Sequence, residues 1–142
     1  MATRPATRCK ACDYIHFPKM PSIRPSTDSD IPAITAIYQH HVLHGTGTFE
    51  IDPPSEADMA SRRADVLARG LPWLVAEKDG QVLGFAYANW FKPRPAYRFS
   101  AEDSIYVADQ ARGMGLGRKL LAELAVPVSY THLRAHETRE DL

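Results

Sequence analysis

Three glycines at alternate positions are the residues of this chain whose spacing most directly implies chemistry. Gly113, Gly115 and Gly117 follow the strand-forming run Ser104–Val107 and precede Lys119–Leu124, which has the composition of a helix. Alternating glycines let consecutive backbone N–H groups converge into a concave nest, and the helix that follows adds unpaired N–H groups and the positive end of its dipole. The spacing therefore predicts a turn that binds a phosphate or pyrophosphate group.

Two common phosphate-binding motifs do not fit this spacing. A P-loop requires Gly-Lys followed by Ser or Thr, whereas Gly117 is followed by Arg118 and Lys119, and no hydroxyl group is available for a magnesium ion. The dinucleotide fingerprint requires Gly-x-Gly-x-x-Gly after the first strand of a βαβ unit, whereas these glycines are evenly spaced and late in the chain. A glycine-rich turn without a ligand is the alternative to a phosphate site.

The pattern Arg/Gln-x-x-Gly-x-Gly/Ala fits the stretch in two registers. It can begin at Gln110 and use Gly113 and Gly115, or begin at Arg112 and use Gly115 and Gly117. The distance from the preceding strand favours the second register. In this form the stretch resembles the acetyl-coenzyme A motif of the GNAT superfamily of N-acetyltransferases.

The resemblance covers the chain from about Ile23 to Ala125 and is specific enough to indicate a branch of the superfamily. Lys-x-Arg-x-Ala-Tyr at residues 92–97, followed by Glu102-Asp103-Ser104, is more specific than the glycines. Further matching segments are Thr46–Glu50, Pro72–Glu77, Asp79–Gly80 and Gly84–Ala88. Together they resemble the phosphinothricin and methionine sulfoximine acetyltransferases.

This resemblance implies the fold class and the domain organisation. We expect an α/β (α+β) protein with the GNAT acyl-CoA N-acyltransferase fold, a mixed and mostly antiparallel sheet flanked by helices, with its C-terminal part missing. The fifth strand, which lies beside the fourth in the family, is expected to be absent. Residues 1–19 are then a leader, residues 20–125 the N-terminal part of the acetyltransferase domain, and residues 126–142 a tail outside it.

The implied reaction transfers an acetyl group from acetyl-CoA, as co-substrate, to the amine of a small amino-acid-like molecule. An amine is mostly protonated at neutral pH, so the site needs a group that removes a proton, and Glu102 has this role in the resemblance. A solvated charge at the end of a strand is the alternative reading of Glu102. Asp103 should face the other side of the strand, because side chains alternate.

The resemblance also implies the residues that bind the two substrates. The main chain of the fourth strand is expected to pair with the pantetheine arm, and the glycine turn to hold the pyrophosphate; the coenzyme-binding residues are Ile105, Tyr106, Val107, Arg112, Gly113, Met114, Gly115, Leu116, Gly117 and Arg118. Arg94 is expected to bind the substrate carboxylate as a guanidinium fork. Lys92 and Tyr97 lie near it in the family pattern, and Phe49 is expected to wall the substrate side chain. Core aromatic rings and solvated loop charges are the alternatives for these four residues.

Composition excludes several other functions. Lys and Arg together number 17, as do Asp and Glu, so the formal net charge of zero provides no field for nucleic acid or an anionic membrane. No apolar run approaches the ~20 residues of a membrane span, and the N-terminus lacks the apolar core of a signal peptide. We therefore expect a cytoplasmic protein of one domain, without nucleic-acid or membrane partners; the resemblance also allows a homodimer.

Local patterns predict the order of the helices and strands. A strand at 22–26 precedes a helix that is capped at 28–30 and stopped by Gly45, and Ser55 with Asp58 resembles the capping box of a second helix that ends at Gly70. Strands at 73–78 and 81–90 are joined by the turn dipeptide Asp79-Gly80. A strand at 102–108 then leads to a third helix, which opens near residues 115–117 and is cut short by Val126-Pro127.

The two ends of the chain carry patterns of their own. Cys9, Cys12 and His16 resemble half of a zinc site, but no second pair follows at ligand spacing, so no metal is expected. His40 and His44 share a helix face without an evident third ligand. Residues 127–139 resemble a translated cloning adaptor. Two alternatives to an active enzyme stay open: a coenzyme-binding fragment without activity, and a small metal- or protein-binding module that uses the leader.

Overall fold

A computed structural model describes residues 20–46, 48–90, 95–97, 100–130 and 134–135. Its sheet has the order β1–β2–β3–β4–β5, with antiparallel pairing from β1 to β4 and parallel pairing between β4 and β5. The strands are β1 (Ser22–Pro25), β2 (Trp73–Lys78), β3 (Gln81–Trp90), β4 (Ser100–Val107) and β5 (Arg134–Ala135). The helices are α1 (Ile31–His44), α2 (Glu56–Ala68) and α3 (Leu116–Tyr130), with short 3₁₀ turns η2 (Asp28–Asp30), η3 (Pro95–Tyr97) and η4 (Asp109–Ala111).

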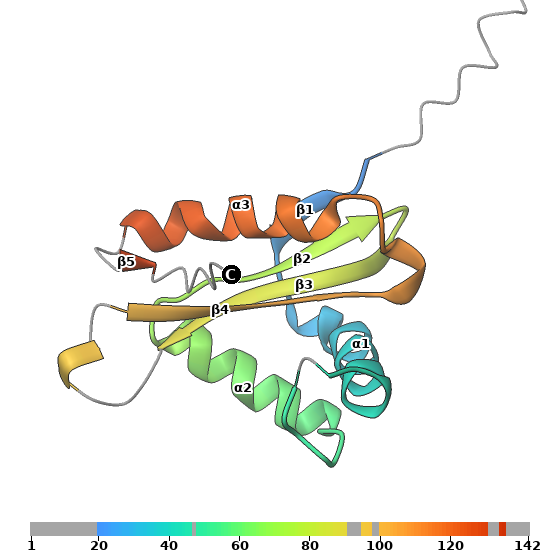
Figure 1. Cartoon of the computed structure of the whole chain (residues 1–142), viewed down its shortest axis with the longest axis horizontal. Coiled ribbons are helices and arrows are strands. Elements are labelled where there is room, and N and C mark those ends of the chain that lie inside the picture. The colour runs from blue at the N-terminus through green and yellow to red at the C-terminus, as the bar shows by residue number, and fades with distance from the viewer. Residues whose placement is uncertain (1–19, 47, 91–94, 98–99, 131–133, 136–142) are drawn as a thin grey trace, which may run out of the picture.

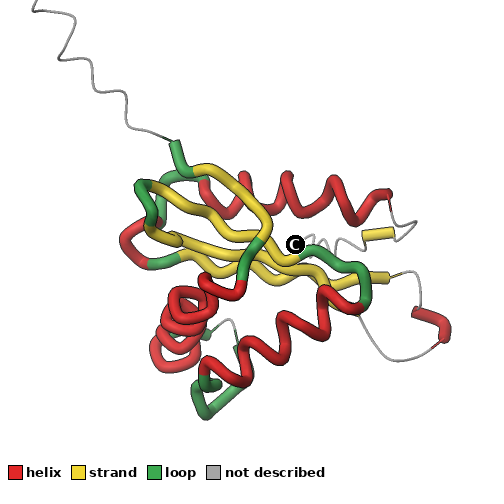
Figure 2. The backbone as a smooth tube through the Cα atoms, turned by 180° about the vertical axis from the view of Figure 1, so that it is seen from behind, coloured by secondary structure: helices red, strands yellow, loops and turns green. Residues whose placement is uncertain are grey.

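The sheet separates α3 from the other two helices. Figure 1 shows α3 along one face of the sheet and α1 with α2 on the opposite face, and the view from behind agrees (Figure 2). Each face has its own core. On one face, Leu74 and Ala86 of the sheet pack with Leu120 and Leu124 of α3. On the other face, Trp73, Val75 and Phe85 pack with residues of α1 and α2. This alternation along β2 and β3 follows from the two-residue period of a strand.

The predicted start of the second helix is confirmed. The hydroxyl of Ser55 accepts a hydrogen bond from the Asp58 N–H at 3.2 Å, and the Asp58 carboxylate accepts one from the Ser55 N–H at 3.1 Å. This reciprocal capping box begins α2. The helix ends two residues earlier than predicted, at Ala68, and Gly70 then adopts a left-handed φ of 74°.

The hairpin predicted at Asp79-Gly80 is also confirmed. Both residues have positive φ, 53° for Asp79 and 78° for Gly80, and Lys78 pairs with Gln81 across the turn. Two successive left-handed residues are the signature of a tight turn whose twist matches that of the flanking strands. The hairpin sets the register of β2 and β3 next to the turn, and an irregularity between Ala76 and Glu77 shifts it by one residue further along.

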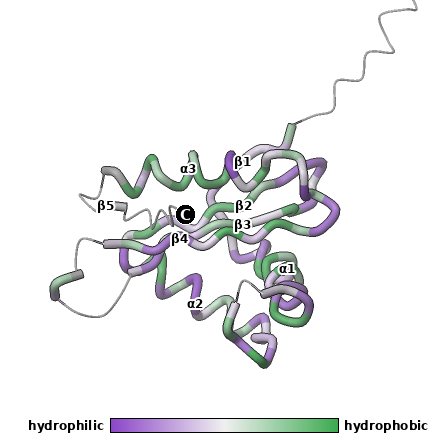
Figure 3. The backbone as a smooth tube through the Cα atoms, in the orientation of Figure 1, coloured by the Kyte–Doolittle hydropathy of each residue, from purple (hydrophilic) through white to green (hydrophobic). Residues whose placement is uncertain are grey.

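The predicted end of the third helix is wrong. Helix α3 continues through Pro127 to Tyr130, and Val128 is only 6% exposed within the core. An interior proline costs about 3 kcal/mol relative to alanine, whereas burying a valine side chain contributes about 1.5–3 kcal/mol. The helix is also more apolar than α2 (Figure 3). Burial of Val128 therefore offsets much of the proline penalty.

The prediction that no strand lies beside the fourth is wrong at one end of β4. Arg134 and Ala135 form the two-residue strand β5, which pairs with Ser100 and Ala101. The strand β4 itself begins two residues before the predicted start and ends one residue before the predicted end. None of the helices in the described ranges has the length and apolar character needed to cross a membrane.

Candidate functional site

The glycine turn between β4 and α3 has the backbone conformation that a phosphate nest requires. Gly113 and Gly115 adopt left-handed φ angles of 80° and 72°, which side chains disfavour. A Cβ atom added to either of them, or to Gly117, would meet no atom within 4 Å, so the space above the turn is open. Helix α3 begins at Leu116, and the N–H groups of its first turn have no acceptor inside the helix. These donors fit an anionic group such as a pyrophosphate.

The cations near this turn differ in their partners. Arg118 is exposed beside Gly117, and the exposed Arg112 makes a 3.1 Å ion pair with Asp109. Met114 is 42% exposed. Lys119 instead donates from Nζ to the Pro21 carbonyl at 2.6 Å. Arg118 is thus an exposed cation at the turn, whereas Arg112 and Lys119 already have partners.

One edge of β4 leads to the glycine turn without a neighbouring strand. Strand β5 pairs only with Ser100 and Ala101, and among the described residues no strand lies beside 102–107 on that side. Ile105 and Val107 pack with the core on the α3 face, and Tyr106 packs on the opposite face. An extended ligand with amide groups could pair with such an edge. The predicted coenzyme-binding residues of strand and turn are thus continuous in space.

Glu102 lies on this strand with an exposed side chain. It is opposite Asn89 of β3 and shares its face of the sheet with Ser104 and Tyr106, because side chains alternate along β4. Asp103 therefore faces the α3 side, as predicted. The strand brings Glu102 to the α1 and α2 face.

Two tyrosines on the same face of the sheet as Glu102 stay protonated at neutral pH. Burial raises the pKa of Tyr106 strongly, and burial also raises the pKa of Tyr87, to which the negative charge of Glu102 adds. Tyr38 packs edge-to-face on Tyr106, with ring centroids 5.0 Å apart. These phenols line the face of the sheet on which Glu102 lies.

The structure places the predicted substrate-binding residues only in part. Lys92 and Arg94 lie outside the described residues, as do Cys9, Cys12 and His16 of the leader. Tyr97 belongs to η3, and its side chain is not among those described. Phe49 is fully exposed in the loop between α1 and α2, so the alternative that it is a core aromatic residue is wrong.

An ion pair between this loop and α2 was missed by the sequence analysis. Arg62 Nη1 lies 2.8 Å from Glu50 Oε1, and its guanidinium carbon lies 5.8 Å from the centre of the Tyr38 ring. Helical spacing places Tyr38 on the buried face of α1, but no local pattern joins Glu50 to Arg62. Only the packing of the loop against α2 brings them together.

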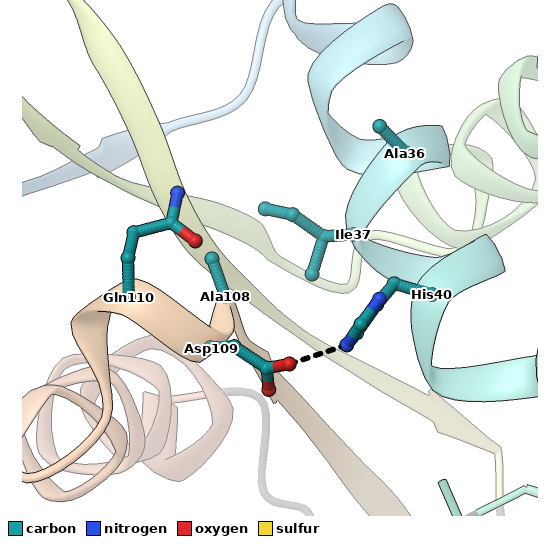
Figure 4. A pocket seen from close by; sticks show the side chains of 6 residues that line it. All are labelled: Ala36, Ile37, His40, Ala108, Asp109 and Gln110. Carbon is teal, nitrogen blue, oxygen red and sulfur yellow. Dashed lines mark hydrogen bonds and ion pairs between the residues drawn. The ribbon is translucent and has the colours of Figure 1, made fainter. Parts of the chain in front are cut away.

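Two histidines of α1 bind the end of β4 and the start of the turn. His40 Nε2 donates to Asp109 Oδ2 at 2.5 Å beside a pocket of about 210 Å³, and the hydrogen bond from His40 lowers the pKa of Asp109 (Figure 4). His41 Nε2 donates to the Val107 carbonyl at 2.9 Å. Among the described residues, no three His, Cys, Asp or Glu side chains gather as a metal site would require. The histidines thus connect α1 to the candidate coenzyme site.

Known proteins share this sequence and architecture. A model of the GNAT acetyltransferase family matches residues 34–135. A phosphinothricin N-acetyltransferase from Alcaligenes faecalis is 55% identical over 103 residues, which are 72% of this chain and 52% of that protein. An L-methionine sulfoximine/L-methionine sulfone acetyltransferase from Pseudomonas paraeruginosa is 43% identical over 108 residues, which are 72% of this chain and 60% of that protein.

A solved structure agrees with these matches. A GNAT superfamily phosphinothricin acetyltransferase from Sinorhizobium meliloti, in complex with AcCoA, superposes with a TM-score of 0.79 and 42% identity over 82% of this chain and 65% of that chain. This chain spans little more than half the length of the curated relatives it matches, 52% and 60%. The predicted branch and fold class are both confirmed. The chain belongs to the GNAT family of acetyltransferases.

Proposed function

We propose that this chain transfers an acetyl group from acetyl-CoA to the amine of a small amino-acid-like substrate of the phosphinothricin or methionine sulfoximine type. The observation that carries the proposal is the open glycine turn at the end of the free edge of β4. The names of the matching proteins support the choice of donor and acceptor. The exposed carboxylate of Glu102 on the same strand supports the reaction type.

In this proposal, the protein backbone binds acetyl-CoA, the acetyl donor. N–H groups from Gly113 to Arg118 bind the pyrophosphate, and the main chain of residues 105–107 pairs with the pantetheine amides. Acetyl-CoA supplies an acetyl thioester, whose acyl group moves to the amine nitrogen while the thiol leaves. In this proposal, a backbone N–H of β4 donates to the developing oxyanion.

Glu102 prepares the acceptor. Its carboxylate accepts a proton from the substrate ammonium, directly or through a water molecule, so that the nitrogen lone pair becomes available. Arg94 binds the substrate carboxylate, with Lys92, Tyr97 and Phe49 nearby, as the family pattern implies. The acceptor then lies on the α1 and α2 face, where Tyr87 and Tyr106 remain protonated.

A second candidate function is coenzyme binding without turnover. It is favoured by one observation, that β5 covers only Ser100 and Ala101 of the outer edge of β4. A pantetheine arm held on one side would leave the thioester poorly placed, and a misplacement of ~1 Å can cost on the order of a hundredfold in rate.

Calorimetry with acetyl-CoA tests the donor site, with the variants Gly117→Asp and Gly117→Ser as a matched pair. Gly117 lies in the first turn of α3, and the Cβ atom that both variants add would meet no atom within 4 Å. A negative charge there suits the helix dipole but repels a pyrophosphate. We expect the Asp variant to lose at least tenfold in affinity and the Ser variant to lose much less, by the charge argument. Equal affinity of both variants for acetyl-CoA would show that the glycine turn does not bind the pyrophosphate.

A thiol-release assay on the same proteins separates the two candidate functions. Release that depends on phosphinothricin or methionine sulfoximine supports acetyl transfer. Tight coenzyme binding without such release supports the second candidate.

A further inference from the structure

The loop between α1 and α2 is tied down at Glu50. Its Oε1 forms an ion pair with Arg62 Nη1 at 2.8 Å. The Glu50 N–H donates a hydrogen bond to the Thr48 hydroxyl at 3.2 Å. The Thr48 hydroxyl in turn lies 3.4 Å from the Tyr38 hydroxyl. The loop is therefore joined to α1 through Tyr38 and to α2 through Arg62.

These contacts reach the face of the sheet on which Glu102 lies. The Arg62 guanidinium lies 5.8 Å from the Tyr38 ring centre, and the Tyr38 ring packs edge-to-face on Tyr106. Tyr106 and Glu102 point to the same side of β4 because they are four residues apart. A continuous set of side chains thus runs from the loop to the strand that bears the candidate base.

Phe49 has no packing of its own to hold it. Its side chain is fully exposed, although it lies between Thr48 and Glu50, which are both partly buried. A solvent-exposed aromatic ring contributes no burial free energy. The place of Phe49 is therefore set by the backbone of its two neighbours, and through them by the ion pair.

We propose that the Glu50–Arg62 ion pair positions residues 48–50, and with them Phe49, as the wall of the acceptor site over the Glu102 face. This inference rests on the proposed acetyl transfer and assigns its acceptor specificity. Glu50 and Arg62 are positioning residues, because they act through the loop. A wall of this kind suits an amino acid with an extended side chain, which can lie along an aromatic ring.

Charge exchange across the pair tests the proposal. We compare Glu50→Arg, Arg62→Glu and the double variant with the unchanged chain, and use Glu123→Arg, exposed on α3, as a control charge reversal. Each single variant places like charges together, so the loop should be released, whereas the double variant restores an ion pair of opposite polarity. We expect the KM for the amine to rise roughly tenfold in each single variant and to return to within about threefold in the double variant. The control and the affinity for acetyl-CoA should not change.

Cleavage by chymotrypsin at Phe49 provides a readout that does not depend on acetyl transfer. Both single variants should be cleaved several times faster than the unchanged chain, and the double variant at close to the original rate. If the unchanged chain releases no thiol, the proposed function fails, while the cleavage rates still decide whether the pair holds the loop.

Two results would overturn the inference. Faster cleavage in the single variants with no change in the amine KM would show that the loop does not form the acceptor wall. A double variant that regains its resistance to cleavage but not its KM would show instead that Arg62 itself binds the acceptor.

Discussion

At the scale of single residues, Glu102 is the group on which the proposed chemistry depends. Replacing it by Gln keeps the size of the side chain and removes the proton acceptor. We expect Glu102→Gln to lower kcat by about 10²–10⁴-fold and to leave acetyl-CoA affinity unchanged. Thiol release under saturating amine measures the first quantity and calorimetry the second.

Asp103 is the matched control for this prediction. It is the next residue of β4, is also exposed, and points to the α3 face. Asp103→Asn removes the same charge and should alter kcat by less than about threefold, since it is separated from the amine by the strand. A kcat in Glu102→Gln equal to that of Asp103→Asn would exclude Glu102 as the base.

At the scale of secondary-structure elements, Arg24 links β1 to η2 and β2. Its guanidinium donates to both carboxylate oxygens of Asp30, at 2.7 and 2.8 Å, and its Nε donates to Glu77. The hydrogen bonds from Arg24 lower the pKa of the buried Asp30 from 3.8 to about 2. A depressed carboxyl pKa contributes stability above its unfolded value, and this contribution is lost as the pH falls toward the folded value.

Asp30→Asn should therefore cost the most stability near neutral pH. The lowering of the Asp30 pKa from 3.8 to about 2 corresponds to roughly 2 kcal/mol of stability. We expect the difference in free energy of unfolding between the original chain and Asp30→Asn to be constant from pH 7 to about 5, and to shrink between pH 4 and pH 2. Urea titrations at a series of pH values measure it. A difference that does not vary with pH would show that the ion pair does not act through the charge of Asp30.

The packing of β3 against β4 and α3 depends on the absence of a side chain at Gly84. A Cβ atom there would lie 2.9 Å from the Tyr106 carbonyl oxygen and 3.4 Å from Leu120 Cδ1. We expect Gly84→Ala to lower the free energy of unfolding by about 1–3 kcal/mol, because the strand must move away from its neighbour.

Gly117→Ala is the control for this crowding. The added methyl group meets no atom within 4 Å, and alanine favours a helix over glycine by up to about 1 kcal/mol. Its stability should be unchanged or higher. Similar losses in the two variants would mean that crowding at Gly84 is not the cause.

At the scale of the whole molecule, α3 covers one face of the sheet as far as its last turn (Figure 1). Val128 is 6% exposed in the core, and Val126 on the same turn is 53% exposed. Val128→Asp places a charge in the core and should cost more than about 2 kcal/mol of unfolding free energy. Val126→Asp should cost less than about 1 kcal/mol, as surface changes usually do. Equal effects in thermal or urea unfolding would mean that the helix does not pack on the sheet beyond Pro127.

Features that depend on neighbouring residues could be predicted from the sequence alone. The capping box of Ser55 and Asp58, the Asp79-Gly80 hairpin and the turn at Gly113 and Gly115 are all present as expected. Their hydrogen bonds and dihedral angles involve residues within a few positions of each other, so residue type and spacing are sufficient.

The tertiary structure decided what depends on distant parts of the chain. Pro127 is tolerated inside α3 because Val128 is buried, and burial is a property of the folded sheet and helices together. The hydrogen bond of His40 to Asp109 joins residues 69 positions apart, and the pair of Glu50 and Arg62 likewise has no local signature. The sequence by itself determined the family, the order of the elements and the glycine turn between β4 and α3. The fold determined which charged side chains meet around that turn and on the α1 and α2 face of the sheet, because such contacts form only when separate elements pack.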